Sequence, residues 1–207
     1  MSIELWAVYL IAAIGLTLTP GPNGLLALTS GARFGFRPSI MTVLGGAFGF
    51  LVLIAVSLAG MGALLMASEM AFTVGKWAGA AYLAYLGIRL WRAPAPVIAQ
   101  VRQDAFSASA RPARLFMEGF LVAVSNPKGI VFFAAFLPQF MTPGVPYLAQ
   151  LVVLGGTFVV VETLYELVLA GLAYRIAPWL ARHGRAFNRI AGGTFVGIGA
   201  VLVTAHR

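Results

Sequence analysis

Apolar residues occur along this chain in six long stretches, and short segments containing charged residues, proline or glycine separate them. A helix needs roughly 20 apolar residues to cross the hydrocarbon core of a bilayer, and it satisfies its own backbone polar groups there. The pattern therefore predicts an all-α integral membrane protein, with a single transmembrane domain over residues 1–207. The six predicted spans lie near residues 3–28, 39–66, 71–91, 113–138, 148–174 and 188–204.

The longest polar segment, about residues 93–112, divides these spans into two groups of three. Repeat one then covers about residues 1–92 and repeat two about residues 113–207. Short sequences recur in the same order in both halves: Lys76–Tyr82 and Arg189–Phe195, Gly45–Phe48 and Gly155–Phe158, Pro22 and Pro127. Repeats with an odd number of spans must insert in opposite directions, so we expect two inverted three-helix repeats. Chance similarity is the alternative, because glycine and alanine are abundant throughout.

Basic residues are concentrated in alternate connections between the predicted spans. Hydrophobic residues make up 60% of the chain and charged residues 10%, yet the formal net charge is +8. Eleven of the 14 Lys and Arg residues lie at or beyond the ends of spans one, three and five: Arg33, Arg37, Arg89, Arg92, Arg102, Arg111, Arg114, Arg175, Arg182, Arg185 and Arg189. Cytoplasmic loops carry an excess of such residues. This face, which includes the segment at 93–112, is therefore predicted to be cytoplasmic, with both termini outside.

Two of the predicted spans, one and four, are interrupted by helix-breaking residues. Proline lacks a backbone N–H, and the groups that it frees are tolerated at membrane depth only inside protein or beside a water-filled cavity. Paired breaks in corresponding spans are a pointer to a transporter binding site, whereas the alternative is a pair of packing kinks. The candidate substrate-binding residues are therefore Pro20, Gly21, Pro22 and Asn23 in span one, and Asn126, Pro127 and Lys128 in span four.

The second break has the pattern of a helix start. Asn126 is a favourable N-cap and Pro127 suits the first helical position. Exposed N–H groups there, together with the Lys128 ammonium, would attract a carboxylate. Lys128 falls near the middle of span four, and an ionisable residue inside the membrane is a functional candidate.

Span five carries two acids, Glu162 and Glu166, which are four residues apart and so lie on one helical face. By depth, Glu162 is expected near the midplane, close to Lys128. We interpret Glu162 as the proton-coupling carboxylate, alternately holding a proton and a substrate ammonium group, and Glu166 as a second coupling group. The alternative is a buried ion pair between Glu162 and Lys128 that only holds helices together.

The other polar residues argue against an intramembrane enzyme. The chain has no cysteine, its two histidines, His183 and His206, fall in a predicted loop and the C-terminal tail, and Asp104 is the sole aspartate. No His-Glu-x-x-His motif is present, so we expect no catalytic residue, no metal site and no cofactor. A passive channel or a structural membrane subunit is the stronger alternative. Buried charges of both signs favour coupled transport, because they would trap ions in a simple pore.

Five segments match a known family: Pro20–Asn23, Lys76–Leu83, Tyr85–Ile88, Asn126–Phe133 and Pro138–Phe140. On these segments the chain resembles the lysine-exporter (LysE/RhtB) family, in its branch of homoserine, homoserine-lactone and threonine efflux proteins. The resemblance implies export of small amino acids or derivatives across a bacterial inner membrane, driven by proton antiport. It makes protons, an amino acid and the bilayer the expected partners, with no nucleic acid and with homo-oligomerisation left open.

The resemblance also bears on the acids of span five. It implies an acidic residue there, often Asp in the family, and Glu162 stands at this place. Glu166 is an additional acid in this chain, which leaves the choice of substrate open.

Overall fold

The computed structural model describes residues 1–19, 21–67, 69–92, 111–142 and 144–204. This part of the chain is helical and contains no β-strand, which agrees with the predicted all-α class. A 3₁₀ turn, Leu137–Phe140, follows α6, and a π-helical turn, Leu151–Gly155, joins α7 to α8. The α-helices are α1 (Ile3–Leu18), α2 (Pro22–Phe34), α3 (Phe36–Ala67), α4 (Glu69–Arg92), α5 (Pro112–Val124), α6 (Pro127–Ala135), α7 (Tyr147–Gln150), α8 (Gly156–Gly171) and α9 (Ala173–Thr204).

Both predicted helix breaks are present as bends between consecutive helices. The axes of α1 and α2 meet at 54°, and those of α5 and the stretch from α6 to Phe140 meet at 49°. Pro22 and Pro127 each occupy the first turn of the helix after the bend. A proline costs little at that position, because the N–H that it lacks would have no partner within the helix. Each proline therefore starts a new half-helix.

Two helical stretches are long and apolar enough to cross a membrane by themselves. Phe36–Gly60 has a mean hydropathy of 2.3, and Tyr147–Gly171 has a mean hydropathy of 1.8. If each bent pair counts as one span, the described residues hold up to four candidate spans. Helices α4 and α9 cover the positions of predicted spans three and six, but neither is among these candidate spans of the described residues. The arrangement of six spans in inverted repeats therefore stays a prediction.

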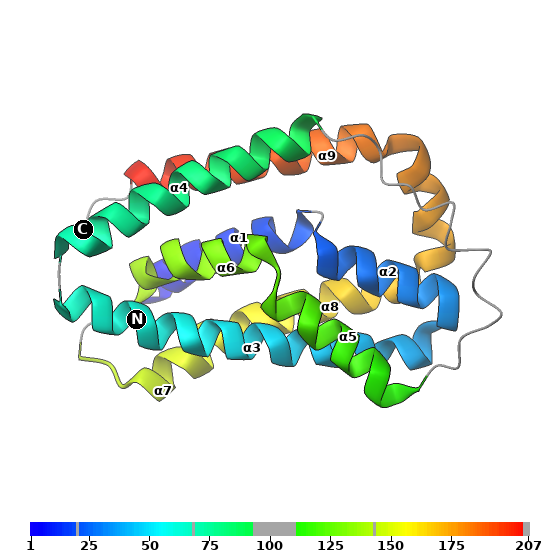
Figure 1. Ribbon diagram of the computed structural model, residues 1–207, viewed down its shortest axis with the longest axis horizontal. Helices are drawn as coiled ribbons and strands as arrows, with labels where there is room; N and C mark the ends of the chain where they lie inside the picture. Colours follow the sequence, from blue (N-terminus) through cyan, green and yellow to red (C-terminus); the bar gives the residue numbers. More distant parts are fainter. Residues whose placement is uncertain (20, 68, 93–110, 143, 205–207) are drawn as a thin grey trace.

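The structure differs from the sequence analysis at the start of α9. Residues 175–187 were expected to connect spans five and six, but α9 begins at Ala173 and continues to Thr204 with Pro178 inside it. Arginine lowers the hydropathy of this segment, yet it is a good helix former, so polarity here does not mark a loop. Figure 1 shows this first part of α9, in orange, turned away from the remainder of the helix.

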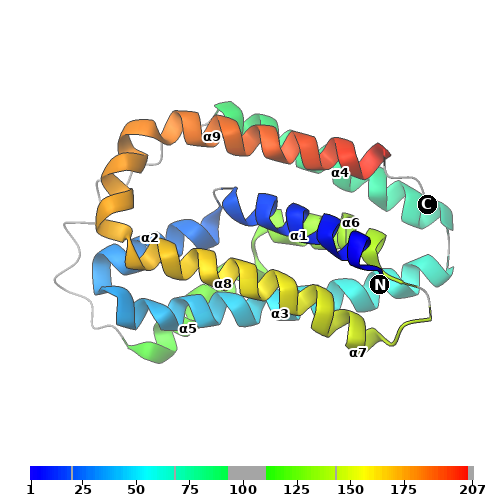
Figure 2. The same cartoon turned by 180° about the vertical axis from the view of Figure 1, so that it is seen from behind.

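Helices from the two halves of the chain lie in pairs (Figure 1). Helix α3 packs along α5, α2 along α8, and α4 along α9. Figure 2, seen from behind, shows α4 and α9 side by side along one side of the bundle, with α1 and α6 between this pair and α3. Each pair therefore joins one helix of predicted repeat one to one helix of predicted repeat two.

Glycines allow the backbones of each pair to approach closely. A Cβ atom placed on one glycine in each pair would overlap backbone atoms of the facing helix. Small residues at such crossings permit close helix packing in membranes. The overlapping partners are Gly45 with Phe116 in α3–α5, Gly31 with Ala170 in α2–α8, and Gly192 with Gly87 in α4–α9.

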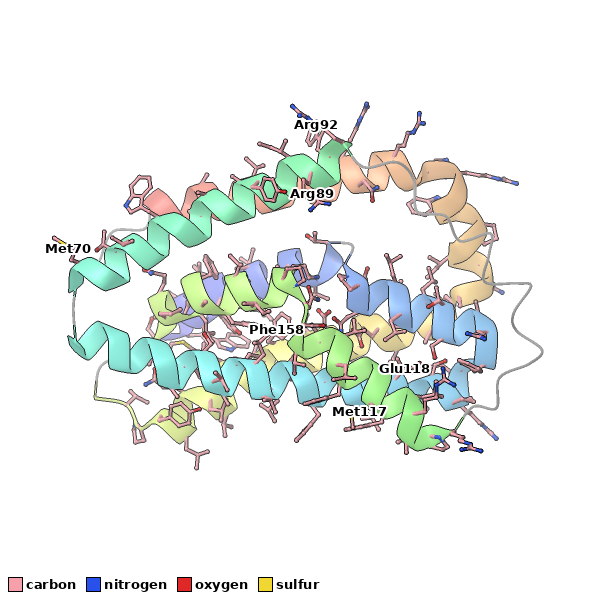
Figure 3. The ribbon with its side chains drawn as sticks, in the orientation of Figure 1. Met70, Arg89, Arg92, Met117, Glu118 and Phe158 are labelled. Atoms are coloured by element: carbon pink, nitrogen blue, oxygen red, sulfur yellow. The ribbon has the colours of Figure 1, made fainter. Side chains whose placement is uncertain are left out.

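Aromatic side chains fill the core of the bundle beside the breaks. Phe158 of α8, labelled in Figure 3, meets Phe50 of α3 and Phe133 of α6 edge to face, with ring centroids 5.3 and 4.8 Å apart. The Tyr9 hydroxyl donates a hydrogen bond of 3.0 Å to the Leu154 carbonyl. Many large apolar side chains face outward instead, as Met70 and Met117 do in Figure 3. An apolar surface of this kind is expected where lipid surrounds the protein.

Candidate functional site at the paired helix breaks

The two helix breaks lie against each other, although 103 positions separate the residues that join them. The Asn126 side-chain amide donates a hydrogen bond of 2.9 Å to the Asn23 side-chain oxygen. Both side chains are buried. A buried polar group left without a partner costs about 1–3 kcal/mol, so this amide pair stabilises the contact between the breaks. The structure thus brings together the two groups of candidate residues from spans one and four.

The start of α6 has the local geometry that its sequence predicts. The Asn126 side-chain oxygen accepts a hydrogen bond of 3.0 Å from the Lys128 backbone N–H, while Pro127 occupies the first turn. Asn126 therefore caps α6 and also holds the other break through its amide. Because the first N–H groups of a helix lack intrahelical partners, this end carries partial positive charge.

The Lys128 ammonium binds the last turn of α1. It donates hydrogen bonds of 2.9 Å to the Leu16 carbonyl and 3.1 Å to the Thr19 carbonyl, and the side chain is only 5% exposed. Carbonyls at a helix C-terminus carry partial negative charge, so a cation is stabilised there. Lys128, which follows the second break, therefore connects it to the first break by hydrogen bonds to backbone carbonyls of α1 and its C-cap.

Gly21 leaves the space that this lysine occupies. A Cβ atom on Gly21 would lie 3.2 Å from the Lys128 Nζ atom, which is tighter than ordinary van der Waals contact. Pro22 follows as the first residue of α2. Pro20, the remaining candidate in this break, lies outside the described residues.

Glu162 also contacts the last turn of α1. Its Oε2 atom accepts a hydrogen bond from the Thr17 hydroxyl, and both side chains are buried. Neither oxygen of Glu162 lies within 4 Å of the Lys128 ammonium, although all of these groups belong to the described part of the chain. The two opposite charges are therefore linked through α1, with Thr17 holding Glu162 and the adjacent carbonyls holding Lys128.

Thr17 was not singled out by the sequence analysis. Its signal is weak, because hydroxyl side chains in apolar helices commonly bond to their own backbone. Thr19 does so, with its hydroxyl donating to the Gly15 carbonyl at 2.8 Å. The useful clue for Thr17 is its position one turn before a predicted break.

Glu166 lies one turn along α8 from Glu162 and is 2% exposed. Among the residues that the structure describes, its Oε1 atom has no hydrogen-bond partner. The Oε2 atom and the Asn23 side-chain nitrogen both point toward Gly46 of α3, and a Cβ there would lie 3.3 and 3.2 Å from them. Glu166 therefore lies on the α2–α3 side of the site, while Glu162 lies against α1.

Metal-binding chemistry was not expected from the sequence. Within the described ranges no group of three or more His, Cys, Asp or Glu side chains is placed to hold a metal ion.

A helical membrane protein with buried opposite charges at paired helix breaks has the features of a transporter. The LysE type translocator model matches residues 14–206, and this chain belongs to that family, as the resemblance predicted. A homoserine/homoserine lactone efflux protein from Salmonella typhimurium is 37% identical over 208 residues, covering 100% of this chain and 99% of that protein.

Two further relatives extend this comparison. An uncharacterized membrane protein from Vibrio cholerae is 34% identical and covers 99% of both chains. A leucine efflux protein from Klebsiella pneumoniae is 31% identical and covers 95% of this chain and 93% of its own. No solved structure gives a significant match.

Proposed function

We propose that this protein exports small amino acids or close derivatives, such as homoserine, threonine or homoserine lactone, across a bacterial inner membrane by proton antiport. The observation that carries the proposal is the meeting of Lys128, Glu162 and two opened helix ends at one buried place. A zwitterion needs a cation and an anion at fixed separation, and this site offers both. The names of the relatives from Salmonella typhimurium and Klebsiella pneumoniae support the substrate class.

In this proposal the substrate carboxylate binds at Lys128 and the N-terminus of α6. Both carry positive charge, and the substrate carboxylate can replace the α1 carbonyls as the acceptor of the Lys128 ammonium. The substrate ammonium group binds Glu162 in place of the Thr17 hydroxyl. A proton that reaches Glu162 from outside neutralises the carboxylate and releases the ammonium group, which couples proton entry to substrate exit. Glu166, one turn away, is proposed to take part in the same proton transfer.

The helix pairing supports alternating access between two inverted repeats. Exchanging the two halves of the chain converts the α3–α5 contact into the α8–α1 contact and the α2–α8 contact into the α6–α3 contact, and it returns α4–α9 to itself; all of these helix pairs are in contact. Such reciprocal pairing is expected when a pseudo-two-fold axis lies in the membrane plane. The breaks would then lie near the axis, where rocking of one repeat against the other opens the site to either side.

Cells that overproduce the protein should tolerate raised homoserine or threonine and release the amino acid faster than cells without it. The measurement is the rate of appearance of radiolabelled amino acid outside preloaded cells, followed in loaded vesicles with and without a proton gradient. Export that depends on the gradient separates coupled transport from a passive channel. If overproduction changes neither tolerance nor release for any amino acid, a structural membrane subunit becomes the better reading.

Both termini should lie outside the cytoplasm. The start of α1 and the end of α9 lie at one end of the bundle, and the α2–α3 and α8–α9 turns lie at the other (Figures 1 and 2). The second end carries Arg33, Arg37 and Arg175, which favour the cytoplasm. A reporter that is active only in the cytoplasm should be silent when fused after Arg207 and active when inserted at residues 93–110. The reverse pattern would overturn this orientation.

A further inference from the structure

The site contains an acceptor and a donor that the bound α-groups of an amino acid would not use. Glu166 is buried, and its Oε1 atom makes no hydrogen bond within the described part of the chain. The Asn23 side-chain oxygen accepts a hydrogen bond from the Asn126 amide, whereas the Asn23 side-chain nitrogen donates to no described residue. A carboxyl oxygen and an amide N–H are therefore both available.

These two groups converge at one point. A Cβ atom on Gly46 would lie 3.2 Å from the Asn23 side-chain nitrogen and 3.3 Å from the Glu166 Oε2 atom. Glycine at this position adds no side chain of its own beside these two groups. Glu166 follows Glu162 by one turn of α8, a rise of ~5.4 Å along the helix axis. An α-amine and a hydroxyl two carbons further along an extended chain span a similar distance.

We propose that Glu166, Asn23 and Gly46 form a side-chain subsite that binds the hydroxyl group of a hydroxylated amino acid. This inference rests on the proposed function, in which Lys128 and Glu162 hold the α-carboxylate and α-ammonium groups. A hydroxyl both donates and accepts hydrogen bonds. It can therefore donate to Glu166 and accept from Asn23 at the same time.

Other side chains satisfy this subsite less well. A second ammonium group donates only, so it would leave the Asn23 amide without an acceptor. An aliphatic side chain would leave both polar groups buried and unpaired. Sites built to hydrogen-bond a substrate hydroxyl discriminate strongly against analogues that lack it, because their own polar groups lose partners. The expected preference for homoserine over leucine is roughly ten- to a hundredfold in kcat/KM.

The test compares homoserine and leucine transport by the full chain in proteoliposomes. Glu166→Leu should lower the homoserine-to-leucine ratio of kcat/KM by about tenfold or more when transport is measured as exchange without a proton gradient, because a loss of coupling alone would lower both rates alike and leave the ratio unchanged. Glu166→Gln retains a hydrogen-bonding oxygen at the same length and should preserve most of the ratio. Gly46→Ala places a methyl group between Glu166 and Asn23, so it should raise the KM for homoserine more than for leucine.

Gly156→Ala is the matched control. Gly156 is a glycine of α8 that aligns with Gly46 in the predicted repeats, and a Cβ there would meet no atom within 4 Å. This variant should keep the parent ratio.

Three results would overturn the subsite. Equal losses for homoserine and leucine in both Glu166→Leu and Gly46→Ala would make these positions structural. A parent that prefers lysine, with that preference lost in Glu166→Leu, would assign the subsite to an amine. A parent that carries leucine and homoserine equally would refute the subsite while leaving amino-acid export intact, whereas a parent that carries no amino acid would refute the proposed function itself.

Discussion

Lys128→Ala is expected to reduce amino-acid efflux to the background of cells that lack the protein, while the chain still inserts. The substitution removes the one basic side chain at the breaks and leaves the Leu16 and Thr19 carbonyls without this donor. Removing one partner of a buried, hydrogen-bonded charge pair typically costs about 2–5 kcal/mol of binding free energy, because the remaining partner is left unpaired. The measurement is efflux of preloaded radiolabelled homoserine, normalised to the amount of protein in the membrane.

Two variants separate loss of charge from other effects. Lys128→Met keeps most of the side-chain volume without the ammonium group, so it should be as inactive as Lys128→Ala. Arg114→Ala removes a basic residue from an ion pair whose arginine side chain is 68% exposed, and exposed pairs contribute little to stability. Arg114→Ala should retain parental efflux. Efflux by Lys128→Met at the parental rate would remove Lys128 from the substrate site.

Glu162→Gln is expected to lose accumulation against a gradient while it keeps exchange of substrate across the membrane. Glutamine fills the same volume and can still accept the hydrogen bond from Thr17, but it cannot take up and release a proton. If protonation of Glu162 drives release of the ammonium group, a neutral side chain uncouples substrate movement from the proton gradient. Vesicles with an imposed gradient measure accumulation, and vesicles loaded on both sides measure exchange.

Glu118→Gln provides the matched control for this substitution. Glu118 forms an i,i+4 pair with Arg114 at the protein surface, with a distance of 2.8 Å from the Arg114 Nε atom. Its loss should change neither accumulation nor exchange. Should Glu162→Gln pump homoserine against a gradient as well as the parent, Glu162 is structural and the coupling group lies elsewhere.

The positions of the helix breaks could be predicted from sequence because their causes are local. Proline fixes the backbone and removes a donor, and Asn126 caps the helix that Pro127 begins. The correspondence of the two breaks suggested that they work together, and the hydrogen bond between Asn126 and Asn23 agrees with this expectation. Local chemistry and the repeated pattern were therefore sufficient to predict where the two helices break.

The partners of the charged residues could not be predicted in the same way. Lys128 bonds to backbone carbonyls, and every residue carries such an acceptor whatever its side chain. An ion pair with Glu162 was the natural alternative from sequence, because depth places both residues at a similar level. The structure instead has Thr17 bonded to Glu162, and that contact depends on how α8 packs against α1.

The start of α9 shows a different limit of sequence patterns. Hydropathy marks lipid-facing segments, whereas a helix that is rich in arginine forms as readily as an apolar one. Residues 175–187 are polar and helical, so the pattern predicted their charge correctly and their secondary structure wrongly. The helices α4 and α9 are present where spans three and six were expected, and neither is among the candidate spans of the described residues.

The glycine contacts between the two halves also govern how the chain can assemble as it is synthesised. Gly45 in α3 fits against α5, and Gly31 in α2 fits against α8, so the closest partners of both helices are made later. When the ribosome has produced only the first half, these glycine-lined faces have no backbone to pack on. Completion of the bundle therefore waits for the second half to enter the bilayer, when α5 and α8 pack against these glycines.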